Sequence, residues 1–141
     1  MSEPTILVTG AAGQVGVDLV PALRDEHGKD KVIAGYHTTP LSGTVAEGPS
    51  TQIDVTDKPR LYQVIRDNKI TQVYHMAALL SAVAEDDPDL AKRVNEGGFR
   101  NVLEIAADNG LRVFWASSMA VYGKDAPREN TPENALLNPE F

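Results

Sequence analysis

The chain has 141 residues, of which 42% are hydrophobic and 23% charged, so it can bury one core as a single domain or part of one. Its 13 Lys and Arg residues against 20 Asp and Glu residues give a net charge of −7, and it has no cysteine, so we expect no nucleic-acid partner, no disulfide and no metal. No basic and apolar leader precedes Ile6 and no apolar run approaches the length of a membrane span, so we expect a soluble, cytoplasmic protein with no membrane partner.

The chain begins with a strand pattern that runs into a glycine turn. The stretch Thr5 to Val8 is mostly β-branched or bulky, as in a buried parallel strand. It leads into the spacing Gly-x-x-Gly-x-x-Gly, which has one more residue between its first two glycines than the usual dinucleotide fingerprint. Gly10 allows a sharp turn, Gly13 leaves room for a pyrophosphate, and Gly16 allows the next helix to pack closely on the strand.

A helix is expected directly after this turn. The amides around Gln14 and Val15 would point at a phosphate from the positive end of that helix. Pro21 lies inside the helical pattern, where proline is normally costly. Apolar residues recur with helical spacing at Val15, Leu19, Ala22 and Leu23. The stretch therefore predicts a cradle for a nucleotide phosphate, with an ordinary glycine turn as the alternative.

The rest of the chain continues to alternate between strands and helices. Further strands are expected at Lys31 to Gly35, Thr51 to Asp54, Gln72 to Met76 and Leu111 to Ala116. Further helices are expected from Thr56 or Asp57 to about Asn68 and from Asp87 to about Asn109, and a surface loop at Thr38 to Pro49. Gly97 and Gly98 interrupt the second of these helical patterns. With right-handed crossovers, this order predicts an α/β fold, a doubly wound parallel sheet with helices on both faces.

In such a sheet, ligands bind beyond the carboxyl ends of the strands. Asp54 and Val55 follow the third strand and suit the amine and ring face of an adenine. Ala77, Ala78 and Leu79 follow the fourth, where small residues let the backbone approach a ribose or pyrophosphate. Ser117 and Ser118 follow the fifth, where a hydroxyl could bond a reacting carbonyl. Asn95 lies in the middle of a helical pattern that it does not favour.

Each of these residues also has a purely structural interpretation. Asp54 can cap a turn, and the alanines can pack in a core. The serines can belong to a polar loop, and Asn95 can face solvent. The sequence alone leaves these alternatives open.

Taken in order, these motifs resemble the extended short-chain dehydrogenase/reductase family. The matching stretches are Thr9 to Gly16, Asp54-Val55, His75 to Ala78, Val94-Asn95 with Gly98, and Ser117 to Gly123. Within that family the chain is similar to the NAD-dependent L-threonine 3-dehydrogenases. The stretches that carry this likeness are Ala77 to Val83, Asn101 to Glu104, Val113 to Trp115 and Pro127 to Pro132. The resemblance covers nearly the whole chain and implies a Rossmann-type dinucleotide-binding domain over residues 1–141.

The resemblance also implies roles for single residues. Gly10 through Gly16 would hold the cofactor pyrophosphate, Asp54 and Val55 the adenine, and Ala77 to Leu79 the adenosine side. Ser118 would be the catalytic hydroxyl that orients the substrate carbonyl or alcohol, and Ser81 would be a substrate contact. Asn95 would hold the catalytic network or a structural water beside the cofactor. The implied cofactor is NAD, and the implied substrate is L-threonine or a similar secondary alcohol.

One departure from the family concerns the choice of dinucleotide. An NAD-selective site has Asp or Glu at the end of the second strand, to bond the ribose hydroxyls and repel a 2'-phosphate. This chain has Tyr36 followed by His37, and no Arg nearby in sequence. Tyr36 could stack on the adenine or close the pocket. We therefore expect weakened discrimination between NAD and NADP.

A second departure concerns catalysis. The family uses a Tyr, with a Lys four residues later, as its acid/base pair. At that spacing Tyr36 is followed by Pro40, Tyr62 by Arg66, Tyr74 by Ala78 and Tyr122 by Ala126. We expect the domain to be incomplete, with the acid/base segment and the substrate lobe absent and the chain inactive alone. A nucleotide-sugar epimerase or dehydratase of the same family, or a non-catalytic dinucleotide-binding module, stays open.

The long helical pattern also bears on assembly. Its apolar positions exceed a single buried stripe, so one face could pack on a partner subunit or inside the chain itself. These positions are Ala91, Val94, Phe99, Val102, Leu103 and Ala106. The family resemblance favours a homodimer of the complete enzyme.

Overall fold

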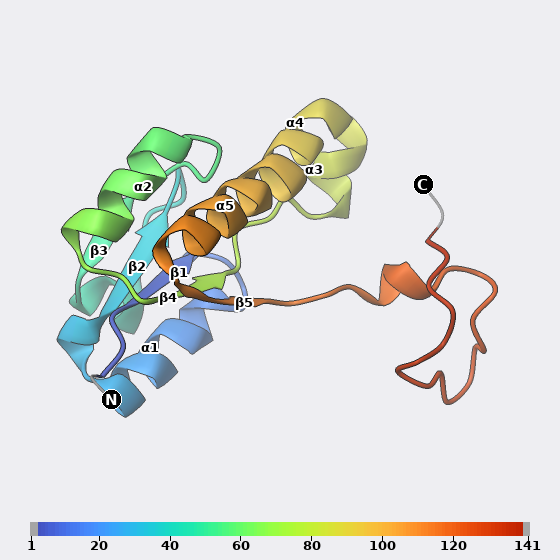
Figure 1. Cartoon of the computed structure of the whole chain (residues 1–141), viewed down its shortest axis with the longest axis horizontal. Helices are drawn as coiled ribbons and strands as arrows, with labels where there is room; N and C mark the ends of the chain where they lie inside the picture. Colours follow the sequence, from blue (N-terminus) through green and yellow to red (C-terminus); the bar gives the residue numbers. More distant parts are fainter. Residues whose placement is uncertain (1–2, 140–141) are drawn as a thin grey trace.

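The structure, a computed structural model, describes residues 3–139, apart from the side chains of residues 81–83. Its centre is a five-stranded sheet in the order β3-β2-β1-β4-β5, in which every neighbouring pair is parallel (Figure 1). The strands are β1 Ile6–Thr9, β2 Val32–Tyr36, β3 Ser50–Gln52, β4 Gln72–His75 and β5 Arg112–Trp115. The predicted doubly wound, Rossmann-like sheet is confirmed.

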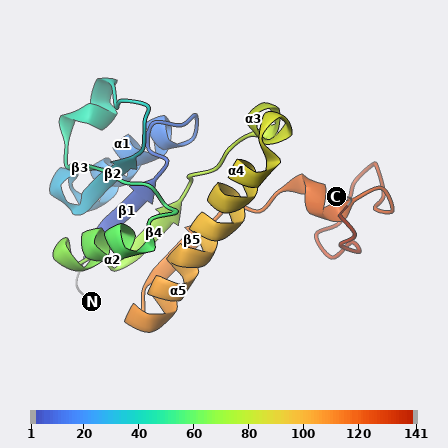
Figure 2. The ribbon, with the colours of Figure 1, turned by 90° about the horizontal axis from the view of Figure 1, so that it is seen from above.

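Helices cover both faces of this sheet (Figures 1 and 2). The helices are α1 Gly16–His27, α2 Lys58–Asp67, α3 Ser81–Asp86, α4 Pro88–Lys92 and α5 Phe99–Asn109. Helix α1 packs on one face, where the core includes Ile6, Val8, Val20, Leu23 and Val32. Helices α2 and α5 pack on the other, where the core includes Leu7, Ile33, Leu61, Val73 and Val102. Residues of β1 alternate between the two cores, which is why nearly all of this strand is apolar.

The expected surface loop at residues 38–49 is partly built into the core. It contains a 3₁₀ turn, Gly43–Glu47, whose Val45 is buried under α1. The guanidinium of Arg24, itself only 7% exposed, donates to the carbonyls of Val45 and Pro49 at 2.8 and 2.9 Å. A buried arginine is stable only when its donors are satisfied, and these carbonyls satisfy it. The loop that leaves β2 is therefore anchored at its far end.

The prediction of a single long helix from Asp87 to about Asn109 is wrong in detail. Helix α4 continues into a π-helical turn, Arg93–Gly98, before α5 begins, so the helix widens at the two glycines. The Cβ of an alanine at Gly98 would lie 2.5 Å from Cγ2 of Val55, so this position needs a glycine for close packing. The short helix α3 was not expected, because six residues are too few to show a helical period.

The two glycines of the π-helical turn are expected to respond differently to substitution. Gly98→Ala should lower the free energy of unfolding by about 1 to 3 kcal/mol, because the new methyl overlaps Val55 and the helix must move away. Gly97→Ala is the matched control, since nothing lies within 4 Å of its Cβ position, and should leave stability unchanged or raise it slightly. Urea unfolding of both variants checks this, and equal losses would contradict it.

Much of the apolar surface of this long helix lies inside the chain. Ala91, Val102 and Ala106 are buried in the chain's own core, whereas Leu103 is 44% exposed. Among the described residues, no helix combines the length and apolar character that crossing a membrane requires.

Candidate functional site

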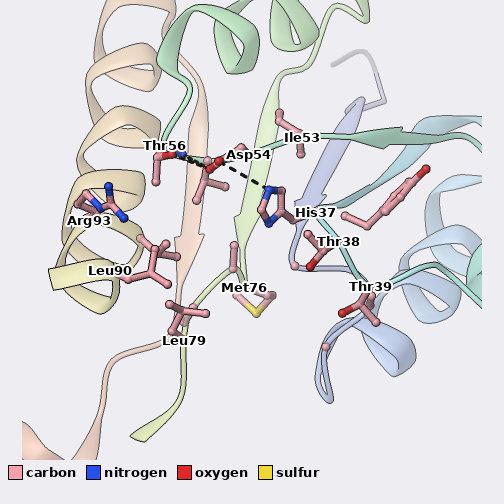
Figure 3. Close-up of a pocket in the computed structure, with 18 residues that line it drawn as sticks. His37, Thr38, Thr39, Ile53, Asp54, Thr56, Met76, Leu79, Leu90 and Arg93 are labelled. Atoms are coloured by element: carbon pink, nitrogen blue, oxygen red, sulfur yellow. Dashed lines mark hydrogen bonds and ion pairs between the residues drawn. The ribbon is translucent and has the colours of Figure 1, made fainter. Parts of the chain in front are cut away.

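A pocket of about 600 Å³ lies at the carboxyl ends of the strands (Figure 3). Its walls come from the glycine turn after β1, the segments after β2, β3 and β4, and the helix that contains the π-helical turn. The lining residues are Gly10, Ala12 and Gly13, residues 36–39, residues 53–56, residues 76–79, and Leu90, Arg93 and Val94. Of the predicted cofactor residues, Gly10, Gly13, Tyr36, Asp54, Val55, Ala77, Ala78 and Leu79 therefore line one pocket.

The glycine turn has no room for side chains. Gly10 has φ +70°, and a Cβ there would lie 2.7 Å from the backbone of Met76 and Ala77. A Cβ at Gly16 would lie 2.5 Å from the carbonyl oxygen of Gly10. A Cβ at Gly13 would lie 3.2 Å from the same oxygen, a tighter contact than most side chains make. The turn is thus held as bare backbone against β4 and α1, which fits a site for a phosphate group.

The start of α1 faces this turn without a capping side chain. Val15 occupies the N-cap position, is 60% exposed and makes no side-chain cap. In the part of the chain that the structure describes, the amides of Gln14, Val15 and Gly16 donate no hydrogen bond within the protein. Free amides at a helix start are suited to an anion. The donor set therefore fits the diphosphate of a dinucleotide.

Asp54 follows β3, lines the pocket and caps a turn. Its Oδ1 accepts hydrogen bonds from the amide and hydroxyl of Thr56 at 2.8 and 2.7 Å, so it caps the turn before α2 (Figure 3). Burial raises the pKa of the Asp54 carboxyl, but the hydrogen bonds from Thr56 and the charges of His37 and Arg93 outweigh burial, so the pKa is lowered overall. The carboxylate is therefore ionised at neutral pH and fixed in the pocket.

A histidine and an arginine line the pocket from two sides. His37 follows Tyr36 at the end of β2, and its Nε2 lies 3.7 Å from Oδ2 of Asp54. Arg93 lines the pocket from the helix on the opposite side. Sequence reasoning missed Arg93, because it is distant in sequence from Tyr36 and only the fold brings both residues to one pocket.

Behind Ala77, a buried polar network supports the pocket wall. The hydroxyl of Thr9 accepts from the amide of Ala77 at 3.3 Å and lies 2.9 Å from Nδ1 of His75. His75 is 3% exposed, and burial lowers its pKa from 6.5 to about 4. Its ring stacks on Phe99, which stacks on Trp115. From the sequence, His75 was identified only as part of a family motif. Its position in a buried strand was the signal that could have revealed this network.

Asn95 and Ser118 lie outside the pocket lining. Asn95 lies in the π-helical turn and bonds the backbone of Leu79, which does line the pocket. Ser118 caps a 3₁₀ turn, accepting from the amide of Ala120 at 3.2 Å, in a segment that stands clear of the sheet (Figures 1 and 2). The side chain of Ser81 lies outside the described residues.

Comparison with known proteins gives three close likenesses. A mitochondrial L-threonine 3-dehydrogenase of Sus scrofa is 38% identical over 138 residues, which make up 98% of this chain and 37% of that protein. The X-ray structure of an L-threonine dehydrogenase from Clostridium difficile superposes with a TM-score of 0.91 at 38% identity, over 99% of this chain and 44% of that one. The UDP-glucose 4-epimerase of Thermus thermophilus in complex with NAD gives a TM-score of 0.81 at 29% identity, over 95% and 44%.

This chain therefore spans less than half the length of each of these proteins. The pattern of the NAD dependent epimerase/dehydratase family matches residues 6–140, which cover nearly the whole chain. The predicted resemblance to extended short-chain dehydrogenases/reductases is confirmed: the chain belongs to the NAD dependent epimerase/dehydratase family.

Proposed function

We propose that this chain is the dinucleotide-binding part of an NAD-dependent oxidoreductase that oxidises L-threonine to 2-amino-3-ketobutyrate. The observation that carries the proposal is the pocket at the strand ends, which is lined by Gly10 and Gly13 of the glycine turn before α1 and by Asp54. Threonine as substrate is supported by the likeness to threonine dehydrogenases over nearly the whole chain.

In this proposal, different residues bind different parts of the dinucleotide. The turn from Gly10 to Gly16 takes the pyrophosphate through backbone amides. Asp54 and Val55 take the adenine, and residues 77–79 the adenosine ribose. A nicotinamide dinucleotide held in this way would supply the acceptor for the substrate hydride.

Catalysis on this scheme needs groups beyond the pocket. Ser118 would orient the substrate hydroxyl, which requires the segment after β5 to fold back towards the pocket. The acid/base Tyr and Lys and the substrate lobe would come from further polypeptide, as would the second subunit of a homodimer. Sedimentation of a complete enzyme would test that dimer, and a monomer would refute it.

The function is tested by cofactor titration and by turnover. The chain should bind NAD by calorimetry, and bind NADP within about tenfold of it, because Tyr36 replaces a repelling carboxylate and the guanidinium of Arg93 adds positive charge to the pocket. It should not reduce NAD with threonine, whereas a version extended through the expected Tyr and Lys and the substrate lobe should. A strong preference for NAD would refute the expected weak discrimination between NAD and NADP. Threonine turnover by the short chain would refute the need for the acid/base Tyr and Lys.

A second candidate is a nucleotide-sugar epimerase or dehydratase. The likeness to a UDP-glucose 4-epimerase with NAD bound favours it, because the same pocket would serve both reactions. The extended version should therefore also be assayed with UDP-glucose. Turnover of the sugar nucleotide without threonine oxidation would select this alternative, and NAD binding without turnover of either would select a non-catalytic module.

A further inference from the structure

Two asparagines on one helix bond two loops that line the pocket, those after β4 and β3. Asn95 lies in the π-helical turn, and its Oδ1 accepts from the amide of Leu79 at 2.8 Å while its Nδ2 donates to the carbonyl of Leu79 at 3.0 Å. Leu79 lies beyond the end of β4, where no strand pairs with it. The side-chain amide of Asn95 therefore bonds Leu79 in the way that a neighbouring strand would.

Asn101 bonds the loop that follows β3. Its Nδ2 donates to the carbonyls of Val55 and Thr56 at 3.0 and 3.3 Å, in the loop that follows β3. Between the two asparagines, Gly98 lets Val55 approach the helix to a distance that no side chain would allow. The helix thus meets one loop at Asn95 and the other at Gly98 and Asn101.

We propose that Asn95 and Asn101 are positioning residues that set the separation of the two loops around the adenosine half of a bound dinucleotide. This inference rests on the proposed dinucleotide-binding function. The contacts go to backbone atoms of Leu79, Val55 and Thr56, all of which line the pocket, so moving either loop moves the pocket wall itself. The π-helical turn supports this role, since such turns inside helices are frequent at functional sites.

The two asparagines differ in a way that a test can use. Asn95 both accepts and donates, so Asn95→Asp keeps the bond from the Leu79 amide and loses only the one to its carbonyl. Asn101 only donates, so Asn101→Asp keeps neither bond and faces two carbonyl oxygens with a negative charge. Asn109→Leu is the matched control, because Nδ2 of Asn109 donates to the carbonyl of Ile105 within the same helix, away from the pocket lining.

The experiment is titration of each variant with NAD and with AMP, together with hydrogen exchange of the Leu79 amide. Asn95→Leu and Asn101→Leu should each bind both ligands about tenfold more weakly, and Asn109→Leu should bind them as the unchanged chain does. Asn95→Asp should lose about threefold, and Asn101→Asp at least as much as Asn101→Leu. The Leu79 amide should exchange faster in Asn95→Leu and at the original rate in Asn95→Asp.

Unchanged affinity in Asn95→Leu and Asn101→Leu, with faster exchange at Leu79, would overturn the positioning role while leaving the proposed function intact. Equal losses in all variants, including Asn109→Leu, would also overturn it, because they would report general destabilisation. Absence of NAD binding by the unchanged chain would overturn the proposed function, and the positioning role with it.

Discussion

Replacing Gly10 with alanine is expected to abolish dinucleotide binding and to lower the free energy of unfolding by about 3 kcal/mol or more. Gly10 has φ +70°, which costs an alanine about 1 to 2 kcal/mol by itself. Its Cβ would also lie 2.7 Å from backbone atoms of Met76 and Ala77. Those atoms cannot move away easily, because Thr9 and His75 pair directly before them in the sheet.

Gly43→Ala is the control that separates backbone strain from the clash. Gly43 has φ +57° but nothing within 4 Å of its Cβ position, so its substitution should cost only about 1 to 2 kcal/mol and leave NAD binding unchanged. Urea unfolding and NAD titration of both variants measure the difference. Equal stability losses, or NAD binding by Gly10→Ala, would show that the turn does not depend on close contact with β4.

Local pattern was enough to predict the sheet and the glycine turn. Buried parallel strands are continuous apolar runs, so β1 and β2 stand out in the sequence, and the turn residues are marked by glycine. The sequence pattern favours an ordinary α-helix across Arg93–Gly98, so the π-helical turn there was not predicted. The two glycines and Asn95 were nevertheless recognised as exceptions to that spacing, and they lie in this turn.

The candidate site was also predicted only in part. Residues directly after strands, such as Asp54 and Ala77, were found because the carboxyl ends of parallel strands meet at one edge. Arg93, which lines the pocket, and Asn101, which bonds a loop that lines it, were missed because their contacts join segments far apart in sequence. Ser118 also follows a strand, but the segment after β5 stands clear of the sheet, so Ser118 does not line the pocket.

The second large effect concerns acid stability and depends on His75. Its pKa is about 4 in the folded protein against 6.5 for an ordinary histidine, because burial disfavours the charged ring. As the pH falls below 6.5, the unfolded chain therefore takes up a proton that the folded chain does not. The stabilisation from neutral His75 is complete above pH 6.5 and is lost as the pH falls towards 4, by about 3 kcal/mol in total.

His75→Gln should remove this dependence, because glutamine can still bond the hydroxyl of Thr9 but does not titrate. Between pH 7.5 and 4.5 the unchanged chain should lose about 2.5 kcal/mol more unfolding free energy than the variant, measured by urea unfolding at each pH. All other ionisable groups are common to both proteins, so their contributions cancel in the difference. Parallel pH profiles would mean that His75 is protonated without cost in the fold.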